Sequence, residues 1–393
     1  MSITIGQFNE SFPPIVDGVA NVVKNYAYWL NKKYGRCCVV TPEHPDAQDD
    51  YGFEVYRYTS FKAPLRGEYR FGLPQMDGPF WHDLKKIPFD IVHSHSPFSS
   101  GLAARSLSRK LDIPFVTTFH SRYRDDLLEA LKSELVVDGV MDIIAAFFDS
   151  ADEVWSVSEA ATDTLREYGY HGPVVVMENG CDIQPRFASP EAIESVNRKY
   201  GLDDSVPLFC YAGRLVWQKN LKVLLKALEI VDKRGLPFHM LFAGDGPRRA
   251  DMEQIVAESG LTDKVTFAGS IADRDELADL YLRSNAMLFP SVYDTSAIVR
   301  REAAACGCPS VLVRGSNAAQ GIDERNGYLV ENNPLAIANA AEHIILHPEH
   351  ARAVGEEARR TLYLSWEDAV QAAYDRYLYL IDRKRRVSAG LGK

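Results

Sequence analysis

Strand-like apolar runs alternate with amphipathic helical runs along most of this 393-residue chain. Because strand, helix and strand in succession favour parallel pairing of the two strands, the alternation predicts an α/β fold with parallel sheets. In the first half, strands are expected at residues 3–8, 37–41, 91–93, 115–118, 153–157 and 174–177. Helices are expected at 19–31, 99–111 and 160–168, and residues 43–88 are expected to form a partly irregular insertion that could hold a hairpin.

Turn-forming residues at 182–187 interrupt this alternation, which then restarts. In the second half, strands are expected at 207–212, 238–243, 265–268, 286–290 and 309–313, and helices at 191–200, 221–234, 248–259, 274–283 and 300–306. A chain of this length can form two domains of ordinary size. We therefore predict two Rossmann-like domains, residues 1–185 and 186–365, and an amphipathic helix over residues 366–383 that must pack on one of them.

Composition limits the class of protein. Hydrophobic residues make up 46% of the chain and charged residues 25%, as in soluble globular proteins. No apolar run reaches the roughly 18 residues of a membrane-spanning helix. The chain opens on a strand without a basic signal region, so we expect a cytoplasmic protein. None of the six cysteines belongs to a CxxC pair, and buried free thiols are expected rather than metal ligands or disulfides.

The net charge of −10 is unevenly placed. Residues 1–185 hold 17 Lys and Arg against 26 Asp and Glu, whereas residues 186–393 hold 27 against 28. The acidic first half argues against nucleic acid as a partner and disfavours docking on anionic lipid. The nearly neutral second half suits a diphosphate better.

Two carboxylates, Asp294 and Glu302, stand eight residues apart around a loop that joins an expected strand to an expected helix. In open parallel sheets, ligands bind beyond the carboxyl ends of strands, where this loop lies. The N-terminus of the helix suits a phosphate, because its N–H groups are free and its potential is positive. Ionised carboxylates accept hydrogen bonds from hydroxyls. Phosphate beside hydroxyls describes a nucleotide sugar.

Two glycine-containing loops also follow expected strands of the second half. In residues 213–220, Gly213 allows close backbone approach, while Arg214 and Lys219 offer positive charge to phosphate oxygens. Gly244 opens the string Gly-Asp-Gly-Pro, which is turn chemistry in any case. The dinucleotide fingerprint GxGxxG is absent from the chain, which disfavours an NAD-dependent dehydrogenase.

In the first half, three features stand at expected strand ends. Gly18 opens the first helix, where its N–H could meet an anion. His120 ends the fourth strand, where an imidazole can bond a sugar hydroxyl or a phosphate. His93 and His95 have an HxH spacing that could bind a metal, but no third ligand is evident and no metal site is predicted. Asp273 is expected to cap the helix at 274–283.

The loops 213–220 and 244–247 and the pair Asp294 and Glu302 together resemble the retaining glycosyltransferases of family 4, which have the two-domain GT-B fold. The resemblance extends over nearly the whole chain, and the motifs come in the order and spacing of the family. It implies parallel sheets facing a central cleft, a second domain that binds the nucleotide diphosphate sugar, and a closing helix that crosses back to the first domain.

The resemblance also implies roles for single residues. Arg214 and Lys219 would neutralise the diphosphate, Asp294 would orient hydroxyls of the donor sugar, and Glu302 would accept from the ribose hydroxyls. His120 would contact the transferred sugar or phosphate and would be catalytic together with Arg214, Lys219 and Asp294. The other donor-binding residues would be Gly18 and Gly244, which line the site, and Ser296, Ala297, Ile298 and Val299, whose N–H groups lie where the phosphate is capped.

The chain departs from the family pattern at one place. The first Glu of the family is here Asp294, and Thr295-Ser296-Ala297 replace Pro-Phe-Gly. Since aspartate is one methylene shorter, the donor sugar stays open. The strings at 93–99 and 118–125 are similar to those of bacterial diacylglycerol glucosyltransferases and phosphatidylinositol mannosyltransferases, which act at membranes. The acceptor therefore stays open between a lipid, with peripheral contact at the inner membrane face, and a saccharide.

We therefore expect a retaining, metal-independent transfer of a hexosyl group from a nucleotide diphosphate sugar to an acceptor hydroxyl, without a cofactor. One alternative is a GT-B-like sugar-nucleotide epimerase. Another is a non-catalytic sugar-nucleotide-binding protein, which Asp294 in place of Glu would favour. The base, the sugar, the acceptor and the oligomeric state are not indicated by the sequence.

Overall fold

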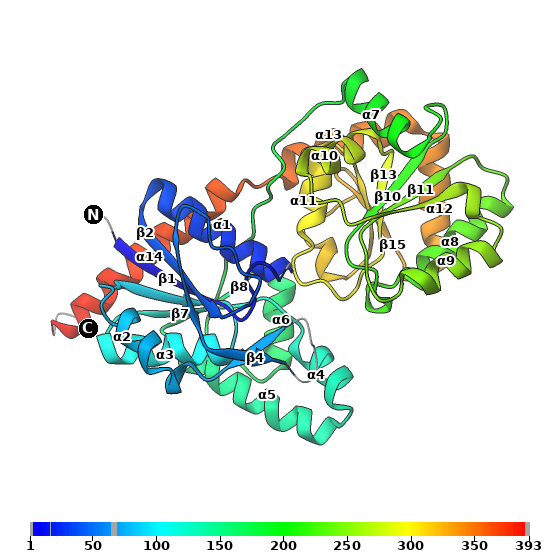
Figure 1. Cartoon of the computed structure of the whole chain (residues 1–393). Coiled ribbons are helices and arrows are strands. Elements are labelled where there is room, and N and C mark those ends of the chain that lie inside the picture. Colours follow the sequence, from blue (N-terminus) through cyan, green and yellow to red (C-terminus); the bar gives the residue numbers. More distant parts are fainter. Residues whose placement is uncertain (1–2, 16, 64–68, 390–393) are drawn as a thin grey trace. The chain divides into compact units, whose positions relative to one another are not determined.

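The computed structural model describes residues 3–15, 17–63 and 69–389, which form two compact units (Figure 1). The first unit holds the described residues up to Asn179 and those from Trp366 onward, and the second unit holds Gly180–Ser365. The division precedes the expected boundary at residue 185. Cys181 explains the difference, because its N–H donates to the carbonyl of Leu364 (2.9 Å) and ties this segment to the end of the second unit.

The first unit is built on a seven-stranded parallel sheet of order β3-β2-β1-β6-β7-β8-β9. Its strands are β1 (Ile3–Phe8), β2 (Gly35–Pro42), β3 (Glu54–Tyr58), β6 (Ile91–Ser94), β7 (Phe115–Phe119), β8 (Glu153–Ser156) and β9 (Val174–Val176). The six predicted strands are confirmed. Strand β3 was not predicted, since it is a half-buried edge strand inside the polar segment 43–88. The hairpin suggested there is the antiparallel pair β4 (Ser60–Lys62) and β5 (Arg70–Gly72).

Helices flank this sheet, and the last helix of the chain is one of them (Figure 1). They are α1 (Gly18–Lys33), α2 (Gly78–Leu84), α3 (Ser99–Leu111), α4 (Tyr123–Leu131), α5 (Glu134–Asp149), α6 (Glu159–Glu167) and α14 (Trp366–Ser388). Helices α4 and α5 were not predicted. The buried face of α14 includes Tyr377, whose ring stacks on Trp155 of β8, and its Tyr374 stacks on Tyr34 after α1. The predicted closing helix therefore packs on the first unit.

The second unit is built on a six-stranded parallel sheet of order β12-β11-β10-β13-β14-β15. Its strands are β10 (Leu208–Ala212), β11 (His239–Ala243), β12 (Val265–Gly269), β13 (Ala286–Phe289), β14 (Ser310–Val313) and β15 (Tyr328–Val330). Its helices are α7 (Pro190–Tyr200), α8 (Leu221–Lys233), α9 (Arg249–Glu258), α10 (Arg274–Arg283), α11 (Ile298–Ala305), α12 (Pro334–Leu346) and α13 (Pro348–Leu362). The elements predicted up to residue 313 are confirmed, and β15, α12 and α13 are additional. The α/β class with parallel sheets in two Rossmann-like halves is therefore correct.

The cores of both units are apolar and contain the cysteines. Buried strand and helix residues form one continuous cluster in each unit. All six cysteines lie in the described part of the chain, are buried and carry free thiols. The expectation of buried free thiols is confirmed.

The attachment of α14 to the first unit depends on an ion pair that can be tested. The guanidinium of Arg376 bonds both carboxylate oxygens of Glu153, whose side chain is 7% exposed and also accepts from the indole N–H of Trp155. Arg376→Ala leaves this buried carboxylate without its cation. The free energy of unfolding should fall by about 1–3 kcal/mol, less than for a fully buried pair because the guanidinium is partly exposed.

Chemical denaturation of the protein, followed through the fluorescence of the first unit's tryptophans, measures this loss. The matched control is Arg386→Ala, which removes an exposed ion pair with Asp382 on the same helix. This control should change the unfolding free energy by less than about 0.5 kcal/mol. Equal effects of the two substitutions would contradict the account of how α14 is held.

Candidate functional site

Three loops meet at the carboxyl edge of the second unit's sheet, and glycines permit the contact. The N–H of Gly213 donates to the carbonyl of Ala243 (3.0 Å), and the N–H of Gly244 donates to that of Gly269 (2.8 Å). A Cβ atom on Gly244 would lie 2.0 Å from the carbonyl oxygen of Gly213. A Cβ atom on Gly246 would lie 2.5 Å from that of Leu215. Backbone packing therefore requires Gly244 and Gly246, whereas Gly213 is favoured by its φ of 145°, which side chains rarely adopt.

The same edge brings Lys219 and Asp294 into direct contact. The ammonium of Lys219 donates to one carboxylate oxygen of Asp294 (2.8 Å), and the hydroxyl of Ser291 donates to the other. The two charged side chains are 15% and 19% exposed. The ammonium also lies 5.4 Å from the ring centre of Phe289. Two residues that were predicted to serve one donor, 75 positions apart, are thus held at one point that solvent partly reaches.

Arg214 lies in the same loop as Lys219 and is exposed. The loop is fixed beneath it, since the hydroxyl of Tyr211 donates to the carbonyl of Arg214 (3.2 Å). The N–H of Leu215 donates to the carbonyl of Asp245 (2.9 Å). A fixed loop with an exposed guanidinium and a half-buried ammonium is suited to phosphate oxygens.

Helix α11 begins beside this pair without a capping side chain. Its N-cap residue, Ala297, has φ 46° and ψ 59° and, being alanine, no side chain that could cap the first turn. Ser296, Ala297, Ile298 and Val299 therefore form a helix start whose N–H groups and positive potential favour an anion. Alanine in the left-handed region is unfavourable, and glycine is the residue that adopts it without cost to the side chain.

Glu302 lies on α11 and is buried. It accepts from the guanidinium of Arg274, at the start of α10, and from the hydroxyl of Tyr281 (3.5 Å). Burial raises the pKa of this carboxyl, and Arg274 opposes the rise. The predicted ribose contact is thus engaged by protein groups in this structure. Sequence reasoning missed Arg274, although its place after β12 was a usable signal, and it predicted correctly that Asp273 caps α10.

In the first unit, Gly18 begins α1 beside an acidic cap. The carboxylate of Asp17 accepts from the N–H of Ala20 (2.7 Å) and from the hydroxyl of Tyr69 (3.1 Å). A Cβ atom on Gly18 would meet nothing within 4 Å, so packing within the protein does not require glycine here. The negative charge of Asp17 stands where the sequence suggested an anion.

His120, at the end of β7, belongs to a buried hydrogen-bonded chain. Its Nε2 lies 2.8 Å from Nδ1 of His95, whose Nε2 lies 2.6 Å from the amide oxygen of Gln7. The ring nitrogens of His93 lie 2.5 Å from the hydroxyl of Tyr377 and 2.6 Å from that of Thr118. Both nitrogens of His93 and of His95 therefore have protein partners, which accounts for the HxH spacing. Burial lowers the pKa of His120 to about 3 and holds those of His93 and His95 well below their usual range.

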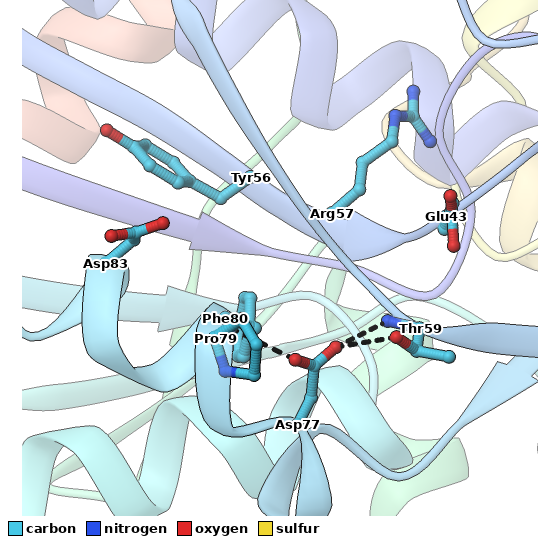
Figure 2. Close-up of a pocket in the computed structure, with 8 residues that line it drawn as sticks. All are labelled: Glu43, Tyr56, Arg57, Thr59, Asp77, Pro79, Phe80 and Asp83. Carbon is cyan, nitrogen blue, oxygen red and sulfur yellow. Dashed lines mark hydrogen bonds between the residues drawn. The ribbon is translucent and has the colours of Figure 1, made fainter.

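A pocket of about 360 Å³ lies elsewhere on the first unit (Figure 2). Asp77 lines it and accepts from the N–H of Phe80 and from the N–H and hydroxyl of Thr59. Its lining residues are Glu43, Tyr56, Arg57, Thr59, Asp77, Pro79, Phe80 and Asp83. None of them was predicted as a site residue, and three carboxylates make the pocket a poor place for a diphosphate.

Comparison with known proteins agrees with this geometry. Residues 16–185 match the family model described as Glycosyltransferase Family 4, and residues 192–361 match the model described as Glycosyl transferases group 1. The chain belongs to the GT-B glycosyltransferases of the family 4 type. Within the residues of this glycosyltransferase that the structure describes, no helix is long and apolar enough to cross a membrane.

Relatives and solved structures that are similar to this glycosyltransferase match it over most of its length. It is 25% identical to the alpha-monoglucosyldiacylglycerol synthase of Streptococcus pneumoniae over 79% of the chain and 71% of that protein. It is 21% identical to the synthase of the same name from Acholeplasma laidlawii over 97% of this chain and 98% of that protein. Sucrose-phosphate synthase from Thermosynechococcus elongatus superposes with a TM-score of 0.78 (21% identity, 97% of this chain and 99% of that chain), which shows the same fold.

The helix start at Ala297 allows a stability test. Ala297→Gly should raise the free energy of unfolding of the second unit by about 0.5–1 kcal/mol, because glycine has no Cβ atom to clash in the left-handed conformation. Ala297→Val, which places a branched side chain there, should lower it. Both are measured by urea denaturation, and a destabilising Ala297→Gly would contradict the strain assigned to this residue.

The buried histidines predict a loss of stability in acid. The unfolded chain protonates histidines near pH 6.5, whereas folded His120 stays neutral down to about pH 3. The unfolding free energy should therefore fall as the pH drops below 6.5, by up to about 1.4 kcal/mol per pH unit for each such imidazole. Denaturation of the first unit at pH 7 and pH 5 measures the slope, and His120→Asn should reduce it. A pH-independent unfolding free energy in this window would refute the prediction.

Proposed function

We propose that this glycosyltransferase moves a hexosyl group from a nucleotide diphosphate sugar to an acceptor hydroxyl, with retention at the anomeric carbon and without a metal ion. The observation that carries the proposal is the contact of Lys219 with Asp294 beside the uncapped start of α11. One place on the second unit thus offers cations and N–H groups to phosphate, and a carboxylate to hydroxyls. Support comes from the Anabaena protein HepE, solved with UDP-glucose, which has the same fold (TM-score 0.76, 17% identity, 96% of this chain and 100% of that chain).

The diphosphate would lie between the loop of Arg214 and Lys219 and the N-terminus of α11. In the reaction, the bond between the anomeric carbon and the phosphate oxygen breaks, and its electron pair stays on the phosphate. The acceptor oxygen forms a bond to the same face of that carbon, and its proton passes to the leaving phosphate. Fixed positive charge at the developing phosphate charge is the main catalytic contribution expected of Arg214, Lys219 and the helix N-terminus.

The ion pair gives Asp294 and Lys219 complementary tasks. In the absence of donor, each neutralises the other, so neither charge is buried alone. A bound donor would draw the ammonium toward its phosphate while Asp294 accepts from a sugar hydroxyl. Glu302 would accept from ribose hydroxyls while it keeps Arg274, since a carboxylate has acceptor positions for both. Gly18 and His120 would act from the first unit.

Exposed apolar side chains on the first unit indicate the class of acceptor. Helix α5 exposes Leu135 (85%), Val136 (51%) and Ile143 (70%), which suits an acceptor with an apolar part. The two relatives named alpha-monoglucosyldiacylglycerol synthase favour the same class. Asp138 and Asp142 are exposed on the same helix, so an uncharged lipid fits better than an anionic one.

Lys219→Ala should lower kcat/KM by at least about 100-fold, since it removes a fixed charge from the transition state. The assay supplies UDP-glucose and GDP-mannose with dioleoylglycerol in neutral vesicles, or with a mixture of free saccharides, and identifies products by mass spectrometry. Lys226→Ala, on the exposed face of α8, is the control and should keep the wild-type rate. Wild-type rates for Lys219→Ala would sink the proposal.

The products separate the alternatives. An epimerase releases a free or nucleotide-linked epimer without an acceptor, and a non-catalytic binding protein consumes no donor. A transferase gives a glycoside whose anomeric configuration matches the donor, and a glycoside of opposite configuration would refute retention. Persistence of the rate in excess EDTA would support metal independence, and its loss, restored by a divalent cation, would refute it.

A further inference from the structure

Glu302 is a buried carboxylate with a single cation as its partner. Its side chain is 6% exposed, and its Oε1 accepts from a terminal nitrogen of Arg274 at the start of α10. Within the described part of the chain, no other cation bonds this carboxylate. Its Oε2 accepts from the hydroxyl of Tyr281 at 3.5 Å, the long limit for such a bond. One oxygen is therefore fixed, and the other keeps room for a further donor.

Arg274 bonds Glu302 and no other group among the described residues. Its Nε is buried and has no hydrogen-bond partner there. By contrast, Arg300 and Arg301 of α11 donate to main-chain carbonyls of other segments and so fasten the helix in place. A guanidinium that served only the packing of the unit would be expected to bond in the same way. The single contact of Arg274 points instead to a task at Glu302.

Glu302 lies one helical turn beyond the start of α11. Ile298 and Glu302 are four residues apart, so they lie on the same side of the helix. Side chains of a helix lean toward its N-terminus, which directs the carboxylate of Glu302 toward the helix start. A phosphate bound at the helix start would bring the ribose of the same nucleotide close to this carboxylate.

We propose that Arg274 is a positioning residue of the donor site, which holds Glu302 by one oxygen and keeps it ionised, so that its other oxygen accepts from the ribose hydroxyls. This inference rests on the proposed function and deepens it by naming the group that prepares Glu302 for ribose. Hydrogen bonds to an ionised group are about twice as strong as neutral ones. Without its cation, a carboxyl buried to this extent would favour the neutral form.

The charges around Glu302 leave this task to Arg274. The titratable and charged groups that face the carboxyl from the elements packed against it are Arg274 and Tyr281 of α10, Cys181 and Asp182 before α7, and Cys306 after α11. Burial raises the pKa of Glu302, Arg274 opposes the rise, and Asp182 adds to it. Burial also raises the pKa of each of the two thiols to about 12, so both are uncharged near pH 7. Ionisation of Glu302 therefore depends on the positive charge of Arg274.

The direct test is the pH titration of the Glu302 carboxyl in the ligand-free protein, followed by carbon NMR after ¹³C-glutamate labelling and assigned by the loss of a signal in Glu302→Gln. Arg274→Met, which keeps an apolar stem without the charge, should raise the titration midpoint by about 1–3 pH units. Arg274→Lys should keep the midpoint near that of the wild type. Lys199→Met is the control, since it removes a cation paired with Glu276 of α10, and it should leave the midpoint unchanged. An unchanged midpoint in Arg274→Met would overturn the inference.

The binding test compares a nucleotide with its 2′,3′-dideoxy analogue, which lacks the ribose hydroxyls. With whichever of UDP and GDP the wild type binds, the ratio of the two dissociation constants reports the ribose contact and cancels the titration of the phosphate. At pH 7, Arg274→Met should weaken binding of the nucleotide by about tenfold, as for a hydrogen bond to a charged group, and that of the analogue by less than twofold. As the pH rises to 9, Glu302 of the variant ionises, so the preference for the ribose hydroxyls should return.

Other results of this comparison would overturn the inference. Equal losses for the nucleotide and its analogue would show that Arg274 acts on phosphate or on the fold. A preference that is lost at pH 7 and stays lost at pH 9 would contradict its role in ionisation. If the wild type binds neither UDP nor GDP, the proposed function and the ribose contact fail together, while the carboxyl titration still shows whether Arg274 keeps Glu302 ionised.

Discussion

Parallel pairing of β10 with β11 and β13 is the constraint on which the second unit's site depends. Because parallel strands end at the same edge, it places the loop of Lys219, the turn at Gly244 and the loop of Asp294 side by side. The glycines let the first two loops touch backbone to backbone. The ion pair between Lys219 and Asp294 then joins the first loop to the third. Without this pairing, residues 75 positions apart would have no reason to meet.

The first unit uses the same edge differently. Its strand ends gather Gln7, His93 and His120, but burial keeps the imidazoles neutral and leaves them to hydrogen-bond one another. Helix α14 completes this chain through Tyr377 and is held by the pair of Arg376 with Glu153. The closing helix therefore has two tasks, to bury the unit's apolar face and to supply Tyr377 to a buried polar chain.

The sequence predicted most of the fold because periodicity and strand ends are local signals. The strands and helices of the second unit up to residue 313 are confirmed within about two residues, the usual uncertainty of such boundaries. The class and the family were also correct. Strand β3 was missed because it is a polar edge strand, and α5 was missed because Leu135, Val136 and Ile143 put apolar residues on its exposed face as well. The short helix α4 was also missed.

The site was less predictable, because its contacts are long-range. Motif order indicated Lys219, Asp294 and Glu302, but not that the first two contact each other or that Arg274 holds the third. Ala297 stands in place of the family's glycine, and it has the left-handed backbone conformation that favours glycine. Only the structure shows this conformation. The partners of His93 and His95 lie up to 284 positions away, beyond any local pattern.

A nucleoside diphosphate is expected to bind at the start of α11, against the loop of Lys219. Backbone amide spectra of the deuterated ¹⁵N-labelled protein, recorded during titration with UDP and with GDP, test it most directly. The amides of Ala297, Ile298 and Val299 and those of residues 213–219 should shift together and saturate at one dissociation constant. Binding that shifts other amides while these stay unchanged would contradict it.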